Sequence, residues 1–123
     1  MAAVDVALKE ALQVDGATAA AVVDGSSGMT LAAAGGSRDF DVSVAAAANT
    51  DVLRAKMRTI EMLNLTDSIE DILVTLDTQY HLIRPVSGHG GRGLFIYLVL
   101  DKRRANLALA RHRLRMIEGS FEM

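Results

Sequence analysis

Residues 21–36, AVVDGSSGMTLAAAGG, contain the glycines and serines that could hold a phosphate group. A phosphate-binding P-loop has the pattern Gly-x-x-x-x-Gly-Lys-Ser/Thr and runs from a strand into a helix. Here no lysine follows the Gly-Ser-Ser-Gly sequence, and the residues after it, MTLAAAGG, have the composition of a strand. The pattern therefore predicts a β-hairpin with its turn at residues 24–28, where glycines supply positive φ angles and Asp24 and the serines bond the turn backbone.

The adjacent carboxylates Glu70 and Asp71 could act as a general acid and a base. Neighbouring side chains on a strand point to opposite faces, so the two could not meet one substrate bond. We expect one to accept hydrogen bonds at the edge of the core and the other to be solvated. The sequence HGGRG, residues 89–93, resembles the oxyanion loop of esterases, but the Gly-x-Ser-x-Gly nucleophile sequence that such enzymes need is absent. We interpret it as a connecting loop.

The three histidines, His81, His89 and His112, fall in a predicted strand, a loop and a helix. None has a second histidine or a carboxylate at the spacing of a metal site, and the chain has no cysteine for a thiolate nucleophile or a zinc site. His81 interrupts the apolar strand sequence QYHLIRP, and we interpret it as a hydrogen-bonded structural residue. With no nucleophile, base or metal site in the sequence, we expect a protein that is not an enzyme, with no catalytic residue, metal or cofactor.

The composition indicates one globular domain over residues 1–123. Half of the residues are hydrophobic, many of them alanine, and only 4% are aromatic. A small domain with so little bulky apolar mass gains stability by burying a face against another chain, so we expect self-association. The net charge of −2 disfavours a nucleic-acid or anionic-membrane partner. The absence of cysteine and of an apolar run of roughly 20 residues fits a cytoplasmic protein without a membrane span.

Hydrophobic periodicity predicts the elements that must position these residues. The first helix and the paired strands after it come from the amino-terminal third, and the sequence LFIYLVL has the unbroken apolar pattern of a central strand. Short links between strands predict a mostly antiparallel sheet. The expected elements are a helix over 1–12, strands over 16–24 and 28–36, a helix over 41–65 with Asp41 as its N-cap, a strand over 69–76, a strand from 79 that ends near Pro85, a strand over 94–100 and a helix over 103–118.

The segment 41–65 is the longest expected helix and has an unusually wide apolar surface. Val42, Leu53 and Ile60 lie on one side when the segment is projected at about 100° per residue. The polar residues confined to a narrow sector are Ser43, Arg54, Arg58 and Glu61. A surface helix of a monomer needs an apolar stripe only about 100° wide. This surface is about twice as wide, so we expect the helix to contact the sheet on one side and a second chain on another.

Three arginines, Arg104, Arg111 and Arg115, are expected in one row on the final helix, opposite its apolar residues. Like charges on one face repel each other unless an acidic surface pairs with them. The row is either a solvated helix face or a surface for an acidic partner, and we take it as the candidate partner surface.

The order of these elements and several phrases resemble the Roadblock/dynein light-chain family, and most closely its short stand-alone bacterial members. The phrases are DGSSGMTLAAAGG, LRAKMRTIEMLNL, IEDILVTLDTQYHLIRPV and LFIYLVLDKRRANLALARHRLRMIE. The resemblance covers residues 5–118 and rests on an Asp-Gly hairpin turn, a strand with a Tyr-His sequence, and an aromatic-aliphatic strand before an Ala/Leu/Arg helix. It implies a profilin-like αββαβββα sandwich, an α/β fold in which helices flank a mostly antiparallel five-stranded sheet.

The resemblance also implies a two-fold homodimer. In dimers of this family the strand after the long helix pairs across the axis and the two long helices lie side by side, which places residues 69–76 and 41–65 at the interface. The family binds small Ras-like GTPases, in some bacteria as a GTPase-activating partner, and regulates or tethers them without a catalytic side chain of its own. The expected interface residues are Ala45, Val52, Met57, Ile60, Leu63, Ile72 and Val74.

Two other functions are compatible with the sequence. The chain could be a sensor domain related to PAS or GAF modules that binds a small ligand in its apolar interior, although its alanine-rich elements favour tight packing over a cavity. It could also be a structural dimer without a GTPase partner, which the sequence does not distinguish from a GTPase regulator.

Overall fold

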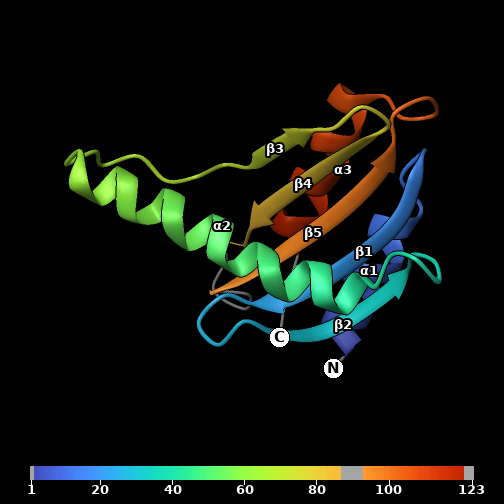
Figure 1. The fold of residues 1–123 in the computed structure, drawn as a ribbon, viewed down its shortest axis with the longest axis horizontal. Coiled ribbons are helices and arrows are strands. Elements are labelled where there is room, and N and C mark those ends of the chain that lie inside the picture. Colours follow the sequence, from blue (N-terminus) through green and yellow to red (C-terminus); the bar gives the residue numbers. More distant parts are fainter. Residues whose placement is uncertain (1, 87–92, 121–123) are drawn as a thin grey trace.

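The computed structural model describes residues 2–86 and 93–120, and its elements follow the predicted order αββαβββα (Figure 1). The mixed α/β fold is therefore confirmed. The elements are α1 (Ala2–Leu12), β1 (Ala17–Asp24), β2 (Met29–Gly35), α2 (Val42–Met62), β3 (Ile72–Thr75), β4 (Gln79–Pro85), β5 (Leu94–Asp101) and α3 (Leu107–Gly119).

The five strands form one sheet in the order β2-β1-β5-β4-β3. Every neighbouring pair among these strands is antiparallel, so the sheet is more regular than the mostly antiparallel one that we predicted. The central position of β5 explains its unbroken apolar sequence, because all residues from Leu94 to Leu100 are buried. Helix α2 carries the chain from β2 at one edge of the sheet to β3 at the other.

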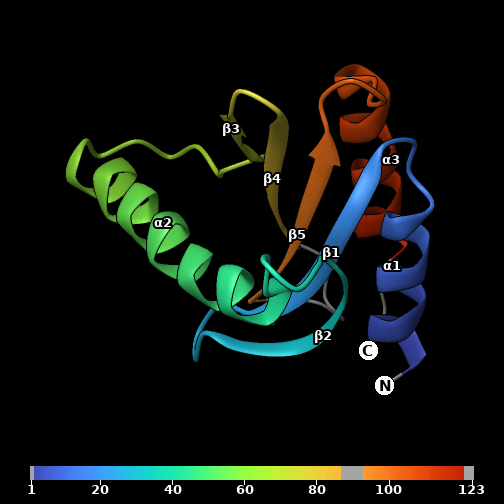
Figure 2. The same cartoon turned by 45° about the vertical axis from the view of Figure 1, so that its right-hand side comes forward.

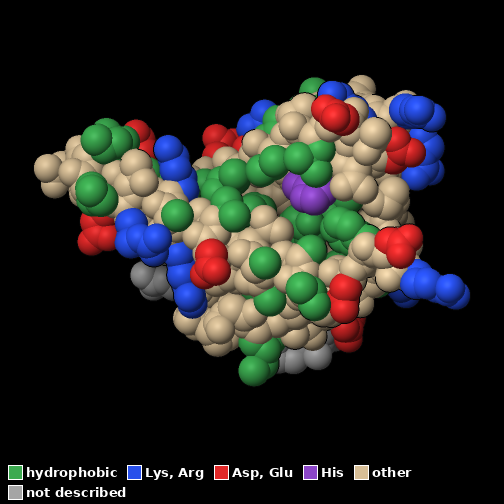
Figure 3. All heavy atoms as spheres, in the orientation of Figure 1, with side chains coloured by type: hydrophobic (Ala, Val, Ile, Leu, Met, Phe, Trp, Pro, Cys, Tyr) green, Lys and Arg blue, Asp and Glu red, His purple; other side chains and the backbone are tan. Residues whose placement is uncertain are grey.

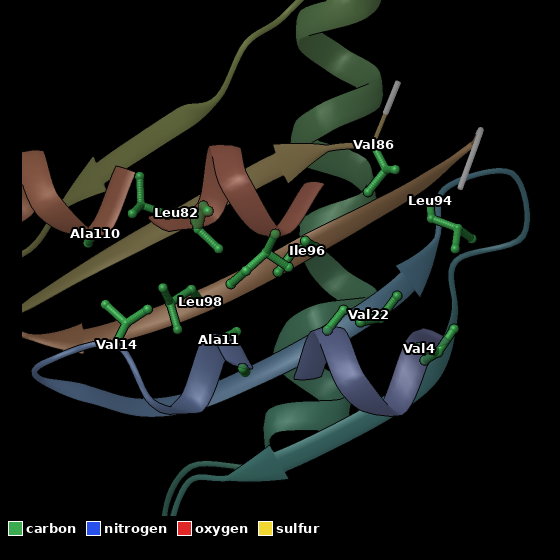
Figure 4. Packing of buried hydrophobic residues seen from close by; sticks show 14 of the residues in the cluster. Val4, Ala11, Val14, Val22, Leu82, Val86, Leu94, Ile96, Leu98 and Ala110 are labelled. Carbon is green, nitrogen blue, oxygen red and sulfur yellow. The ribbon is translucent and has the colours of Figure 1, made fainter. Parts of the chain in front are cut away.

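Two helical layers cover the sheet (Figure 2): α1 and α3 lie on one face and α2 lies on the other. Strand β1 alternates between them, since Ala20 and Val22 join the core under α1 and α3, and Ala21 and Val23 join the core under α2. Figure 4 shows the first of these cores, in which Val22 and Ile96 from the sheet lie beside α1 and α3. Fully buried alanines in β1 leave room for a helix to approach each face closely.

The β1–β2 turn has the hairpin chemistry that the sequence predicts. The Asp24 carboxylate accepts hydrogen bonds from the Ser26 backbone amide at 2.9 Å and from its hydroxyl at 2.7 Å, and these bonds hold the pKa of Asp24 below its usual value. Gly28 has a φ angle of 78°. The guanidinium of Arg54 donates to the carbonyl oxygens of Gly25 at 3.0 Å and Ser26 at 2.6 Å, so the turn is fixed against α2.

Gly35 and Gly36 turn the chain out of β2 toward α2, and both have positive φ angles, 86° and 83°. A Cβ atom at Gly35 would clash with the carbonyl oxygen of Thr18 on the neighbouring strand. Glycine is therefore favoured at both positions, because it adopts positive φ angles without strain and has no Cβ atom.

Three predicted boundaries are wrong. The helix expected over 41–65 ends at Met62, with Leu63 as its C-cap. The last helix begins at Leu107 instead of at residue 103, because Asn106 is its N-cap and accepts a hydrogen bond from the Leu109 amide at 3.1 Å. The strand expected over 69–76 is formed only by Ile72–Thr75, and residues 69–71 before it belong to no strand. In the described part of the chain, no helix has the length and apolar character needed to cross a bilayer.

Candidate partner-binding site

The first half of α2 is anchored on the sheet. Asp41 caps the helix as predicted, and its carboxylate accepts a hydrogen bond from the Val44 amide at 3.2 Å. Val42, Ala46 and Leu53 are buried against the sheet, with the spacing of one helix face.

The second half of α2 projects beyond the sheet, and the chain returns from its tip to β3 (Figure 1). This end of the molecule exposes large apolar side chains: Met62 is 81% exposed, and Met57, Leu63 and Leu65 are also exposed. Figure 3 shows apolar side chains at the tip of α2 and over β3 and β4 on the same side of the molecule. Monomeric soluble proteins rarely expose such a series, so the tip has the properties of a surface that another chain covers.

Strand β3 forms one edge of the sheet and pairs only with β4 among the described strands. An edge strand offers free backbone donors and acceptors to another strand. Val74 and Leu76 are exposed at this edge. Among the described elements, only β4 packs extensively against β3. The edge is therefore open for pairing with a second chain.

An apolar groove of about 690 Å³ separates α2 from the segment that leads into β3. Charged groups stand at its rim, namely Lys56 from the helix and Glu70 from the other wall. The groove is lined by Val52, Ala55, Lys56, Thr59, Ile69, Glu70, Asp71 and Ile72.

The structure brings most of the predicted interface residues to this side of the molecule. Val52 and Ile72 line the groove, Met57 and Ile60 line a smaller hollow of about 230 Å³ next to it, and Leu63 is exposed near the tip. Val74 is exposed on the edge strand. Ala45 lies elsewhere, since it packs against the core beneath α2.

The predicted arginine row is wrong in its geometry. Arg104 lies outside α3, in the turn before it, and its Nε donates to Asp101 at 3.2 Å. Arg111 makes two hydrogen bonds to Asp71, and Arg115 donates to Glu70 at 3.2 Å. The three arginines are therefore paired with carboxylates of the same chain, partners that the sequence analysis did not predict. The exposures agree with the expectation for Glu70 and Asp71, since Asp71 is 7% exposed and Glu70 is 68% exposed. The strand alternation from which this was inferred is wrong, because both residues precede β3 and both pair with arginines of α3.

A buried arginine that sequence reasoning missed lies beneath this ion-pair group. Arg84 on β4 is 6% exposed, and its Nη2 donates to Glu118 on α3 at 3.0 Å. Its Nη1 lies 3.9 Å from Glu70. An arginine in an apolar strand sequence, next to a proline that ends the strand, was the available signal, since such a charge must find a buried partner.

His81 is a hydrogen-bonded structural residue, as its sequence context predicts. Its Nε2 lies 2.9 Å from Gln79 Oε1, and its Nδ1 lies 3.1 Å from the Tyr97 hydroxyl. Because Gln79 Oε1 only accepts, Nε2 carries the proton and Nδ1 accepts from Tyr97. Phe40 meets the ring edge-on at 6.0 Å. Burial lowers the pKa of His81 and raises the pKa of Tyr97 to about 12, so both are uncharged near neutral pH.

The described residues contain no cluster of three histidine, cysteine or acidic side chains that could hold a metal ion. His112 is exposed on α3. His89 and most of the HGGRG sequence lie outside the described residues.

Solved structures of low sequence identity share this fold. A Roadblock/LC7 domain from Streptomyces avermitilis superposes with a TM-score of 0.78 at 14% identity, over 94% of this chain and 92% of that one. The gliding protein MglB from Thermus thermophilus gives 0.70 at 17% identity, over 96% and 90%. MglC from Myxococcus xanthus gives 0.63 at 22% identity, over 95% and 94%.

Neither a family model nor a curated protein matches the sequence. The structural likeness spans nearly the whole length of all three proteins, and the element order agrees with the resemblance seen in the sequence. The chain therefore has the Roadblock/LC7 fold.

Proposed function

We propose that this protein is a homodimer that binds a small Ras-like GTPase and regulates its activity or location. The observation that carries the proposal is the coincidence of an open sheet edge with an exposed apolar helix end on one side of the molecule. Met62 and Leu63 are exposed at that helix end, and β3 lacks a described neighbour on its outer side. Both features are explained if a second chain covers them.

A second copy of the chain fits this surface because a two-fold axis brings identical patches together. Antiparallel pairing of the two β3 strands would satisfy the free backbone groups of each edge and extend the sheet across the axis. The same axis places the projecting ends of α2 near the partner's groove, where Val52 and Ile72 offer an apolar surface. Burying these exposed side chains stabilises the dimer by about 25 cal/mol for each Å² removed from water.

The GTPase partner is supported by the fold and by the resemblance to the Roadblock family, whose members bind small Ras-like GTPases. The structural likeness to MglB and to a Roadblock/LC7 domain agrees with that role. In this proposal the chain supplies no catalytic side chain. It acts by holding one conformation of the partner, which changes the rate of GTP hydrolysis or nucleotide release by its differential affinity for the two nucleotide states.

The experiment combines oligomeric state with GTPase kinetics. The purified protein is mixed with each Ras-like GTPase encoded in the same genome, and single-turnover hydrolysis and nucleotide release are measured. We expect one GTPase to respond, and the response to be lost in a Met62→Glu variant that sediments as a monomer. Val6→Glu is the matched control, because Val6 is an exposed apolar residue of α1, on the other helical layer. If the protein is a dimer but changes the kinetics of none of these GTPases, the proposed regulation is wrong and the alternative, a structural dimer without a GTPase partner, is favoured.

A further inference from the structure

Residues 102–117 concentrate positive charge in a chain that is acidic elsewhere. This segment contains six lysines and arginines and no carboxylate, while the rest of the chain has seven cations and fifteen carboxylates. It forms the turn before α3 and all of that helix except its last two residues, Glu118 and Gly119, and lies on the sheet face opposite α2 (Figure 2). The charge is therefore on a different surface from the proposed dimer interface.

Carboxylates of the same chain pair with only some of the lysines and arginines in this segment. Arg104, Arg111 and Arg115 are paired with acidic residues of the chain, as described above. In the described ranges, no carboxylate oxygen lies within 4.0 Å of the guanidinium nitrogens of Arg103 or Arg113, although the Arg103 backbone amide donates to Asp101 at 3.0 Å. Both arginines are exposed, so their charges are available to a partner.

Arg113 lies between two exposed apolar side chains of the same helix. Leu109 is 45% exposed and Met116 is 59% exposed. Their spacing from Arg113, four residues before and three residues after, places the three side chains in one stripe of the helix surface. The core-facing residues Ala110, Leu114 and Ile117 occupy another face. An apolar and cationic stripe is thus presented outward on α3.

We propose that this stripe binds an acidic amphipathic helix of a partner protein. Such a helix would place aliphatic side chains on Leu109 and Met116 and carboxylates near Arg113 and Arg103. Charge complementarity favours an acidic protein segment and steers its approach, and methionine adapts its shape to apolar partners.

A lipid surface fits the stripe less well. A membrane-bound amphipathic helix inserts a continuous apolar face, but the apolar face of α3 is already buried on the sheet. Nucleic acid also fits less well, because phosphate contacts need several free cations and gain nothing from Leu109 and Met116. The apolar component therefore decides in favour of a protein helix.

The probe is a synthetic peptide of about 14 residues, or about 21 Å as a helix. It carries leucines at positions i, i+3, i+4 and i+7 and glutamates on the flanking positions. A peptide of the same composition with permuted positions and a peptide with lysine in place of glutamate serve as controls. Binding is followed by fluorescence anisotropy and by backbone amide chemical shifts of the full chain at low and high salt.

We expect the acidic amphipathic peptide alone to bind, with shifts confined to α3, and its affinity to fall with salt. Arg113→Glu should weaken binding about tenfold or more, and Leu109→Ser with Met116→Ser should abolish it. Arg58→Glu, an exposed cation of α2, should have no effect. All these residues are exposed, so circular dichroism should show the same fold in every variant.

Three results would overturn the proposal. These are no binding of the acidic peptide, equal binding of the permuted peptide, and an affinity that does not respond to Arg113→Glu. Tighter binding of anionic lipid vesicles or of a DNA duplex to the same stripe would also overturn it. None of these results bears on dimer formation or on GTPase kinetics, which are measured separately by sedimentation and by nucleotide hydrolysis.

Discussion

The guanidinium of Arg111 on α3 holds the carboxylate of Asp71 through two hydrogen bonds, 2.9 Å from Nε to Oδ2 and 2.6 Å from Nη2 to Oδ1. The two residues are 40 positions apart in the chain, and Asp71 directly precedes β3. The hydrogen bonds to Asp71 raise the pKa of Arg111 above its usual value. This pair fixes the start of the edge strand to the helix behind the sheet, so it positions the strand that the proposed dimer uses.

Replacing Arg111 by leucine should destabilise the fold by about 2–3 kcal/mol, because it leaves the nearly buried Asp71 carboxylate without its charged partner. Arg115→Leu is the matched control on the same helix. Arg115 pairs with the exposed Glu70, and an exposed pair of this kind contributes about 0.2–1 kcal/mol. Urea unfolding at one fixed protomer concentration compares the two variants. Equal losses of unfolding free energy would contradict the assignment of Asp71 as a buried anchor.

Met62→Glu should convert the proposed dimer to a monomer that remains folded. Met62 is 81% exposed in the single chain, so the new charge is solvated in the monomer and desolvated only at the interface. Sedimentation velocity reports the oligomeric state, and circular dichroism reports the fold. Val6→Glu, at an exposed position of α1, should leave the dimer intact. If both variants sediment like the parent protein, the tip of α2 is not at the interface.

Val52→Glu and Ile60→Glu test the groove side of the same interface. Val52 lines the large groove and Ile60 lines the smaller one. A buried charge without a partner costs several kcal/mol, so each variant should yield monomer or aggregate when examined by sedimentation. An unchanged native dimer in both variants would refute the role of α2 in the interface.

The stability should fall on acidification in a way that depends on His81. Burial lowers the pKa of His81 below its ordinary value of 6.5, so the unfolded chain binds more protons between the two values. The contribution of a neutral His81 is therefore complete above pH 6.5 and is lost as the pH falls through 6.5 toward the folded pKa. The groups that face the ring, Gln79, Tyr97 and Phe40, carry no charge that would stabilise an imidazolium.

His81→Gln should reduce this part of the pH dependence. Urea unfolding at about pH 7.5 and about pH 5.5 measures it, on either side of the ordinary histidine pKa. His112→Gln is the control, since His112 is exposed on α3. The same pH dependence in the parent protein and in both variants would show that the pKa of His81 is the same in the folded and unfolded states, which would contradict its lowering by burial.

Sequence patterns predicted the elements whose signals are local. The buried run of β5, the turn after Asp24 and the N-cap Asp41 each depend on neighbours within a few residues, and all three are present in the structure. The start of α3 was wrong although Asn106, a strong N-cap residue, stood in the sequence. The arginines before it are good helix formers and favoured the earlier start. The short β3 strand was overestimated because its apolar residues continue on both sides.

The sequence indicated that the long helix has a second contact surface, but it did not indicate which residues face that surface or which ion pairs form near it. The wide apolar surface of the long helix indicated a second contact, yet periodicity does not separate residues that face the core from those that face a partner. Ala45 was therefore grouped with Val52, although it packs on the core. The bonds from Arg111 to Asp71 and from Arg84 to Glu118 join distant segments. Such pairs depend on the tertiary arrangement, and a single sequence contains no signal for them.

The most direct measurement of the central claim is GTP hydrolysis by each Ras-like GTPase of the same genome, with and without an excess of this protein. The account predicts that for one of them hydrolysis or nucleotide release changes by about tenfold or more, which is about 1.4 kcal/mol of barrier. It also predicts that Met62→Glu abolishes the change and Val6→Glu preserves it. Unchanged kinetics for every GTPase tested, with the native dimer confirmed in the same samples, would contradict the account.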